Sequence, residues 1–224
     1  GALDVIEAQA AKIGAPLLVH GQHWHVRTEH ERLVFEDESG LCDLPLPNLL
    51  GAHQVSNAGA ALAGLRHLKL GEPAWTSALQ NAEWPARMQR LRHGPLVELA
   101  AGHELWLDGG HNAAAGAALA SVLADLPLRP TYFICGMLKT KDVAGYLRPL
   151  ASGATGLVSV SIPGETATLS AEETAAAARD VGVEAHPAAS VEAAIARVHG
   201  EDPAARILIC GSLYLAGQVL RENG

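Results

Sequence analysis

Along residues 84–224, short apolar runs alternate with longer segments in which apolar residues recur every three to four positions. The short runs predict strands, and the longer periodicity predicts helices. The predicted strands are 96–99, 104–107, 132–135, 156–160 and 206–210, and the predicted helices are 112–126, 143–150, 171–180, 191–198 and 213–222. Strands that alternate with helices favour right-handed crossovers, so the expected fold class is α/β, with a Rossmann-like, mainly parallel sheet and flanking helices.

Residues 1–83 show a different pattern. Apolar residues at helical spacing predict three helices, and short apolar runs predict three strands with polar residues between them. The predicted helices are 3–13, 54–70 and 75–81, and the predicted strands are 17–19, 23–27 and 32–37. Three strands are too few for a whole domain of this kind. We therefore expect residues 1–83 to be the end of a larger domain, with the domain boundary near residue 83.

Composition excludes several classes of protein. The 224 residues are 49% apolar and 18% charged, as in ordinary globular chains. No run approaches the roughly 18 apolar residues of a membrane span, and the first residues lack the pattern of a signal peptide. The net charge of −8 argues against a general nucleic-acid binder. The three cysteines, Cys42, Cys135 and Cys210, are far apart in the sequence and show no disulfide or metal-ligand spacing. We therefore expect free, buried cysteine side chains in a protein of the reducing cytoplasm.

The strand end at residues 108–112 is the strongest candidate for a ligand site, because open parallel sheets bind ligands at the carboxyl ends of their strands. The segment reads Asp-Gly-Gly-His-Asn and precedes a helix. Asp108 can accept hydrogen bonds from sugar hydroxyls, the glycines permit close approach, and His111 lies beside a helix N-terminus that favours anions. The alternative is a plain turn with Asn112 as the helix cap.

Two further strand ends carry weaker signals. Residues 136–142 include Lys139 and Lys141, which could meet phosphate or carboxylate groups, although solvated lysines are the commoner explanation. After the strand 206–210, Ser212 is in a position to bind a ligand or simply to cap the last helix.

Metal and phosphate motifs are weak or missing in the printed sequence. His20, His23 and His25 could share one face of a strand, but no fourth ligand is marked, so ordinary hairpin histidines are the favoured interpretation and no metal ligand is assigned. Neither the G-x-x-x-x-G-K-[ST] nor the G-x-G-x-x-G pattern occurs.

Five motifs, ordered and spaced across nearly the whole chain, together carry a family resemblance. They are Leu44-Pro45-Leu46-Pro47 through Gly51-Ala52-His53-Gln54 to Asn57-Ala58, Trp84-Pro85-Ala86-Arg87, Asp108-Gly109-Gly110-His111-Asn112, Gly136-Met137-Leu138 with Lys141-Asp142, and Gly211-Ser212-Leu213-Tyr214-Leu215-Ala216-Gly217. The chain resembles the C-terminal part of the bifunctional dihydrofolate synthase/folylpolyglutamate synthases, in the Mur ligase superfamily.

The chain departs from the family pattern mostly by small-residue changes. The family usually has Arg at Ala52, Gly at Ala86, Ala at Gly110, Pro at Ala113, and Ala-Asp at Lys139-Thr140. The last change leaves the role of Lys139 and Lys141 open.

The resemblance implies an ATP-dependent ligase that joins L-glutamate to dihydropteroate and/or to folates. A substrate carboxylate would take the γ-phosphoryl group of ATP, and the amino group of glutamate would then displace phosphate from the acyl phosphate. Such chemistry needs cations on the phosphates and close placement of two substrates. The expected ligands are ATP, Mg²⁺, L-glutamate and dihydropteroate or folate. We expect the protein to be monomeric and to bind neither nucleic acid nor a membrane.

By the same resemblance, Asn57 and Arg87 would contact ATP, with the Arg87 guanidinium on the phosphates. Asp108 would hold the ribose, and His111 would lie beside the transferring phosphoryl group, so that His111 and Arg87 are the catalytic candidates. The alternatives are a surface ion pair for Arg87 and a polar helix-surface side chain for Asn57.

The resemblance also assigns the glutamate site. His111, Ser212 and Tyr214 would position the incoming amino acid, with a core position as the alternative for Tyr214.

Family members carry a P-loop, magnesium ligands and a carbamylated lysine in an N-terminal ATPase domain, none of which matches here. We therefore expect residues 1–83 to be the remainder of the central ATP-binding domain, residues 84–224 to be the C-terminal glutamate ligase domain, and the chain alone to be inactive. Two alternatives remain: a non-catalytic Rossmann-like module that binds a nucleotide or amino acid, and a peptidoglycan Mur ligase. The motifs at 84–87 and 108–112 favour the folate branch over the latter.

Overall fold

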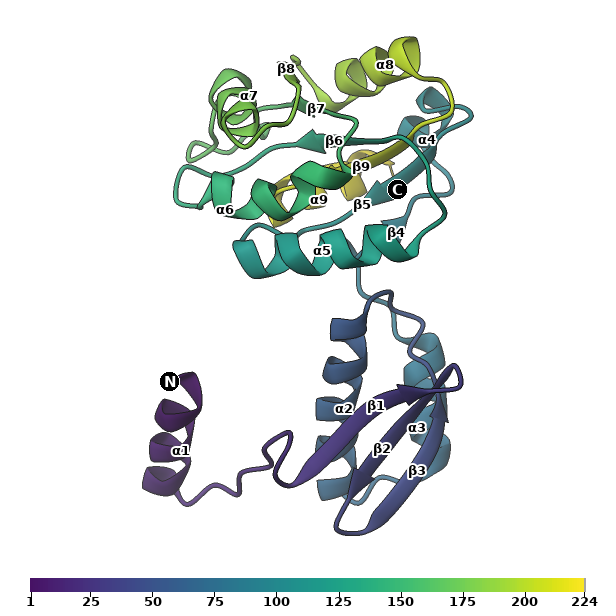
Figure 1. Cartoon of the computed structure of the whole chain (residues 1–224), viewed down its shortest axis with the longest axis vertical. Coiled ribbons are helices and arrows are strands. Elements are labelled where there is room, and N and C mark those ends of the chain that lie inside the picture. Colours follow the sequence, from purple (N-terminus) through teal and green to yellow (C-terminus); the bar gives the residue numbers. More distant parts are fainter. Residues whose placement is uncertain (224) are drawn as a thin grey trace. The chain divides into compact units, whose positions relative to one another are not determined.

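The computed structural model describes residues 1–223, except for the side chains of residues 72 and 73. The chain forms two compact units, Gly1–Glu83 and Trp84–Gly224 (Figure 1). No helix among the described residues is long and apolar enough to cross a membrane.

The first unit contains a three-stranded antiparallel sheet in the order β1-β2-β3, with two helices packed against it. Its elements are α1 (Ala2–Ile13), β1 (Trp24–Glu29), β2 (Arg32–Asp37), β3 (Gly40–Pro45), α2 (Ala52–His67) and α3 (Glu72–Asn81). The strands predicted at 23–27 and 32–37 are therefore confirmed as a hairpin, to which the unpredicted β3 adds a third strand.

Aromatic side chains fill the core of this unit. Trp24, Phe35 and Trp75 are buried together with Leu62 of α2. The guanidinium of Arg66 lies 5.4 Å from the ring centre of Phe35 and 5.1 Å from that of Trp75, a cation–π arrangement that closes the core at its edge. No residue of α1 is buried.

The second unit is an α/β domain whose six-stranded sheet has the order β4-β5-β9-β6-β7-β8. Only β4 pairs antiparallel, so the prediction of a mainly parallel sheet with flanking helices is confirmed. Its elements are β4 (Gln89–Arg90), α4 (Pro95–Leu99), β5 (Glu104–Leu107), α5 (Ala113–Asp125), β6 (Thr131–Cys135), α6 (Val143–Leu147), the 3-10 helix η1 (Arg148–Gly153), β7 (Gly156–Ser159), α7 (Ala171–Asp180), β8 (Ala185–Pro187), α8 (Val191–Glu201), β9 (Arg206–Cys210) and α9 (Leu213–Asn223).

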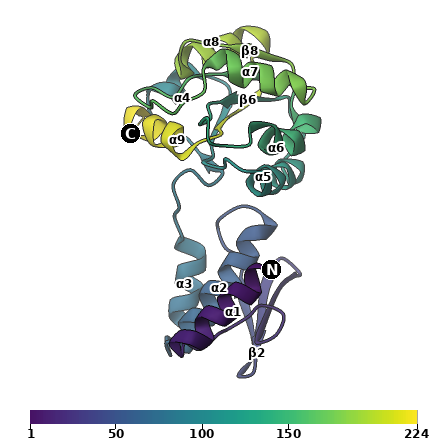
Figure 2. The ribbon, with the colours of Figure 1, turned by 90° about the vertical axis from the view of Figure 1, so that its left-hand side faces the viewer.

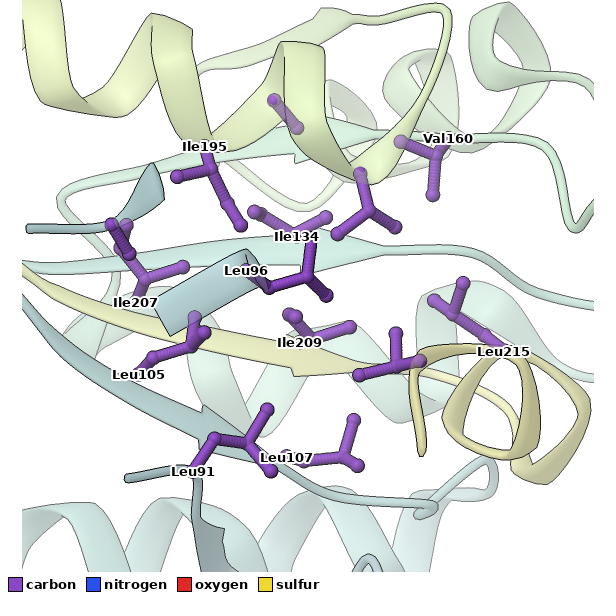
Figure 3. Close-up of a cluster of buried hydrophobic side chains, with 14 of the residues drawn as sticks. Leu91, Leu96, Leu105, Leu107, Ile134, Val160, Ile195, Ile207, Ile209 and Leu215 are labelled. Atoms are coloured by element: carbon purple, nitrogen blue, oxygen red, sulfur yellow. The ribbon is translucent and has the colours of Figure 1, made fainter. Parts of the chain in front are cut away.

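Helices cover both faces of this sheet because successive strand residues point to opposite sides. In β9, Ile207 and Ile209 belong to the apolar cluster formed with α4, α8 and α9, whereas Leu208 and Cys210 belong to the cluster formed with α5, α6 and α7. Figure 2 shows α4 and α9 on one side of the sheet and α5 and α6 on the other. Figure 3 shows side chains of the first cluster interlocking between strands and helices.

The predicted strand at 96–99 is wrong, because residues 95–99 form the short helix α4. Pro95 stands at the start of this helix, where its missing N–H costs nothing. The N–H of Leu96 donates to Oδ1 of Asn223, and Nδ2 of Asn223 donates to the carbonyl of His93. A side chain 127 residues away in sequence therefore caps this helix. The local pattern of apolar residues could not reveal a cap that comes from so distant a residue.

The predicted strand at 17–19 is also wrong. Leu18 is 43% exposed and the segment forms no strand. The N–H of Val19 donates to Nδ1 of His23, and Nε1 of Trp24 donates to the carbonyl of Leu18. These side chains satisfy the backbone in place of a neighbouring strand.

A nearly buried ion pair ties β5 to β9 at the amino ends of the strands. Nε of Arg206, whose side chain is 3% exposed, lies 3.2 Å from Oε2 of Glu104. Burial favours the neutral form of Glu104, but hydrogen bonds from Arg206 and Trp106 and the charges of Arg90 and Arg129 outweigh it. The pKa of Glu104 is therefore lowered below its ordinary 4.5.

We expect Glu104→Gln to destabilise the second unit by about 3 kcal/mol, because it leaves the buried charge of Arg206 without its partner. Since the pKa of Glu104 is lowered in the folded chain, its contribution is complete above about pH 4.5 and is lost as the pH falls through the folded value. Urea unfolding of the wild type and of the Glu104→Gln variant between pH 7 and pH 3 would measure the difference in their free energies of unfolding. Glu201→Gln removes an exposed helix pair and is the matched control; equal effects of the two substitutions would contradict the prediction.

Candidate functional site

Three loops meet at the carboxyl ends of β5 and β9. The N–H of Gly109 donates to the carbonyl of Ala86 over 2.8 Å, and a Cβ atom built on Gly109 would lie 2.3 Å from Cδ2 of Leu213. The loops are residues 84–88, 108–112 and 211–212, and the last of them leads directly into α9. Four of the six predicted site residues, Arg87, Asp108, His111 and Ser212, lie in these loops. Tyr214 lies in the first turn of α9, whereas Asn57 belongs to the first unit.

Asp108 is 8% exposed, and its carboxylate is bound to the backbone. Oδ2 accepts the N–H of Met88 over 2.9 Å, and Oδ1 accepts the N–H of Gly110 over 2.7 Å. The side chain therefore joins the loop that carries Arg87 to the loop that carries His111. A carboxylate has about four acceptor positions, so lone pairs remain and contact with a ribose stays a prediction.

Arg87 lies between two residues with left-handed backbone conformations. The φ angle is 56° at Ala86 and 42° at Met88, values that cost a residue with a side chain about 1–2 kcal/mol each. Ala86 stands where the family usually has Gly, which adopts this conformation freely. Arg87 is a half-buried residue, and its guanidinium forms no hydrogen bond or ion pair within residues 1–223, so the surface ion pair considered as its alternative is absent there.

His111 is held in one tautomer. Its Nδ1 lies 2.9 Å from the carbonyl oxygen of Gly109, and because a carbonyl can only accept, Nδ1 carries the proton. Nε2 is left with a lone pair that can contact a ligand. Next to it, Oδ1 of Asn112 accepts the N–H of Ala115 and caps α5. The helix cap that was the alternative interpretation of this segment is therefore present together with the candidate site.

Ser212 and Tyr214 stand at the start of α9 and differ in exposure. Ser212 is buried, and its Oγ accepts the N–H of Tyr214 over 3.1 Å, which caps the helix and leaves the hydroxyl proton free to donate. Tyr214 is 59% exposed, so the core position considered for it is wrong. Their contacts with glutamate stay predictions.

Asn57 lies on the exposed surface of α2, where Nδ2 donates to Oε1 of Gln54 over 3.0 Å. Nε2 of Gln54 lies 2.9 Å from Nε2 of His53. This is the polar helix-surface arrangement considered as the alternative for Asn57, and it neither supports nor excludes contact with ATP.

The three histidines at residues 20–25 have partners other than a metal. The His20 ring stacks on Trp24 with 4.5 Å between centres, and Nδ1 of His23 accepts the N–H of Val19. Across residues 1–223, no three His, Cys, Asp or Glu side chains are grouped so as to hold a metal ion.

Beneath the loops lies a buried group that the sequence did not assign to the site. Cys135 and Cys210 are paired residues of β6 and β9, and the Tyr146 hydroxyl is buried near both. The hydrogen bond to Cys210, together with burial, raises the pKa of the Cys135 thiol well above its ordinary value, and burial does the same for Tyr146. The raised pKa values favour the neutral forms of Cys135 and Tyr146, so these two side chains are buried packing groups beneath the site rather than nucleophiles. The only feature of the sequence that pointed to this buried group is the glycine that follows each of the two cysteines.

The fold and the site define a Rossmann-like domain with a candidate ligand site at the carboxyl ends of its strands. Residues 97–222 match the family described as "Dihydrofolate synthetase, C-terminal domain". The chain therefore belongs to the folylpolyglutamate synthase/dihydrofolate synthase family, as its C-terminal domain region of Mur ligase type. This match supports the folate branch over the peptidoglycan ligases.

Relatives of this family resemble almost the whole chain. Folylpolyglutamate synthase of Lacticaseibacillus casei is 29% identical over 201 residues, which cover 84% of this chain and 42% of that protein. Escherichia coli FolC in complex with DHPP and ADP has a TM-score of 0.80 and 26% identity, covering 97% of this chain and 50% of that one. A bifunctional synthase with Mn, AMPPNP and L-glutamate bound has a TM-score of 0.76 and 25% identity, covering 96% and 50%. The chain thus spans about half the length of these relatives.

We expect Gly211→Ala to damage the site and Gly217→Ala to leave it intact. Gly211 has φ 101°, and a Cβ there would meet Sγ of Cys135 at 2.8 Å and the carbonyl of Gly136 at 2.9 Å, so the substitution should cost about 2–3 kcal/mol. Gly217 lies inside α9 with no atom within 4 Å of the added Cβ, so Ala there should stabilise by up to about 1 kcal/mol. Urea unfolding would compare them, and equal stabilities would refute the close packing at Gly211.

Proposed function

We propose that this chain is part of an ATP-dependent acid–amino-acid ligase that joins L-glutamate to dihydropteroate and/or to folates through an acyl phosphate. The observation that carries the proposal is that the three segments that carry Arg87, His111 and Ser212, each part of a family motif, meet at the carboxyl ends of β5 and β9. Relatives of the same fold are described with ADP, DHPP or L-glutamate bound, which supports these classes of ligand.

Arg87 would contribute the positive charge. Its guanidinium has no partner among the described side chains, so no ion pair must be broken before it meets a phosphate. The planar fork can donate two hydrogen bonds to phosphate oxygens and stabilise charge that shifts during phosphoryl transfer.

His111 would act beside the acyl phosphate. Because Nδ1 is bound to the carbonyl of Gly109, Nε2 is the atom that can reach the ligand, accepting a proton when the ring is neutral and donating one when it is charged. Ser212 can donate its hydroxyl proton, and the exposed ring of Tyr214 can flank the glutamate. Asp108 would contact the ribose. Asn57 would contact ATP, a role for which its position within a family motif is the only support.

The residues described here do not offer a magnesium site, since they contain no group of three potential ligands. In the proposed ligase, the magnesium ligands and the P-loop would therefore lie in polypeptide outside these 224 residues. Residues 1–83 would be the remainder of the central ATP-binding domain, residues 84–224 the glutamate ligase domain, and the location cytoplasmic.

A non-catalytic nucleotide- or amino-acid-binding module is the alternative function, because it needs only the strand-end site. Sequencing the gene upstream of Gly1 separates the two: a P-loop segment supports the ligase, and an upstream region without one supports the module.

We expect the 224-residue chain alone to hydrolyse no ATP and to form no folate product. Phosphoryl transfer depends on positioned cations and phosphate-binding backbone, and the printed sequence has no P-loop. The assay is purified chain with ATP, magnesium, dihydropteroate and L-glutamate, with a complete family synthase as the positive control. Product above the blank would show that the chain carries the whole active site and would refute the prediction.

In the complete ligase polypeptide, Arg87→Ala should lower kcat by about 10²–10³-fold, because it removes charge stabilisation in the transition state. Arg87→Lys should recover only part of the rate, since a point charge does not reproduce the planar fork. His111→Ala should also act mainly on kcat. Steady-state kinetics with ATP varied at saturating glutamate would test this, and wild-type kcat and KM in all three variants would reject the assignment of the site.

A further inference from the structure

The loop that carries Arg87, residues 84–88, has an unusual backbone. Ala86 and Met88, with φ of 56° and 42°, stand on either side of Arg87, and neither is a glycine. Such conformations persist only where the surrounding structure determines them fully, and they gather at functional sites. The contacts that hold this loop in its strained conformation therefore indicate how Arg87 is positioned.

Three hydrogen bonds restrain the loop. The N–H of Ala86 donates to Oε1 of Gln89 over 2.9 Å, and the carbonyl of Ala86 accepts the N–H of Gly109 over 2.8 Å. The N–H of Met88 donates to Oδ2 of Asp108 over 2.9 Å. Both strained residues are thus bound through their backbone polar groups, and two of the three bonds use a side chain.

The pairing of β4 with β5 explains the role of Asp108. Gln89 pairs with Leu107 and Arg90 with Trp106, so the next pair in this register would be Met88 with Asp108. The N–H of Leu91 donates to the carbonyl of Leu105, so Met88 and Asp108 would form a non-hydrogen-bonded pair, and in a continuing strand the N–H of Met88 would point away from β5. Met88 instead has a left-handed backbone and donates its N–H to the carboxylate of Asp108, so this side chain holds the chain where the pairing of β4 with β5 ends.

Packing adds a second restraint. Ala86 is buried in the apolar cluster that contains Leu107, and Met88 is buried in the cluster on the opposite face, which contains Trp106. The two neighbours of Arg87 are therefore anchored on both sides of the sheet edge. The guanidinium of Arg87 has no partner among the described residues, so the restraints fix the backbone around Arg87 and leave its charge available.

We propose that Gln89, together with Asp108, is a positioning residue that holds the strained loop 84–88 so that Arg87 is presented to the phosphates. Gln89 acts through Arg87 and touches no ligand. The inference rests on the proposed function, because it requires that Arg87 act on the phosphoryl group.

The first test is hydrogen exchange, followed by NMR, on the 224-residue chain. The amides of Ala86 and Met88 should be protected in the wild type, and Gln89→Ala should accelerate exchange at Ala86. Gln89→Glu keeps an acceptor oxygen at the same place and should leave Ala86 protected. An unprotected Ala86 amide in the wild type would overturn the proposed restraint.

The second test is a double-mutant cycle in the complete ligase polypeptide. Gln89→Ala should lower kcat/KM by about three- to tenfold, the size expected for one lost hydrogen bond, and Gln89→Glu should restore most of it. In an Arg87→Ala background, Gln89→Ala should add less than about a twofold change, because there is no cation left to position.

The outcomes separate this inference from the proposed function. If Arg87→Ala is strongly impaired while Gln89→Ala has the wild-type rate, or if the two losses multiply in full, the positioning role is wrong and the function stands. If Arg87→Ala has the wild-type rate, the proposed role of Arg87 fails, and the positioning role with it.

Discussion

The insertion of β9 between β5 and β6 is the constraint on which the site depends. β9 is the last strand in the sequence, yet it pairs with both neighbours, so that Leu107 stands opposite Ile209 and Cys135 opposite Cys210. Parallel strands end at the same edge of a sheet, so this pairing brings residues 211–214 beside residues 108–112. The same insertion carries the C-terminal helix α9 back across the domain, where Asn223 caps α4.

Within the site, the residues that hold the loops are distinct from those left free for a ligand. Asp108, Gln89 and the cap Asn112 have acceptor atoms bound to the backbone. Arg87, Nε2 of His111 and the Tyr214 ring are available in the described structure. This division suits phosphoryl and acyl transfer, where most of the catalysis comes from groups fixed in advance rather than from side chains that form covalent bonds. Burial favours the neutral forms of Cys135 and Tyr146, so these two side chains add no competing charge beneath the site.

Two arginines of the second unit have contrasting surroundings. Arg206 forms a nearly buried ion pair with Glu104 at the amino ends of β5 and β9, and this pair holds the two neighbouring strands together. The loop that carries Arg87 lies at the opposite ends of these strands, and Arg87 has no ion pair among the described residues. The position of Arg87 within a family motif at the strand ends makes it the candidate for ligand binding.

The sequence determined the α/β class, the mainly parallel sheet and most element boundaries, because strands 104–107 and 206–210 and helix 171–180 are encoded by local periodicity. The motifs at 84–87, 108–112 and 211–217 also predicted a candidate site, since the second and third directly follow the strands 104–107 and 206–210. Tertiary structure alone decided the helix at 95–99, which depends on Asn223, and the absence of a strand at 17–19, where His23 and Trp24 bind the backbone. It likewise decided the hydrogen bond between the carboxylate of Asp108 and the N–H of Met88, because a bond between a side chain and a backbone group 20 residues away leaves no periodic signal in the sequence.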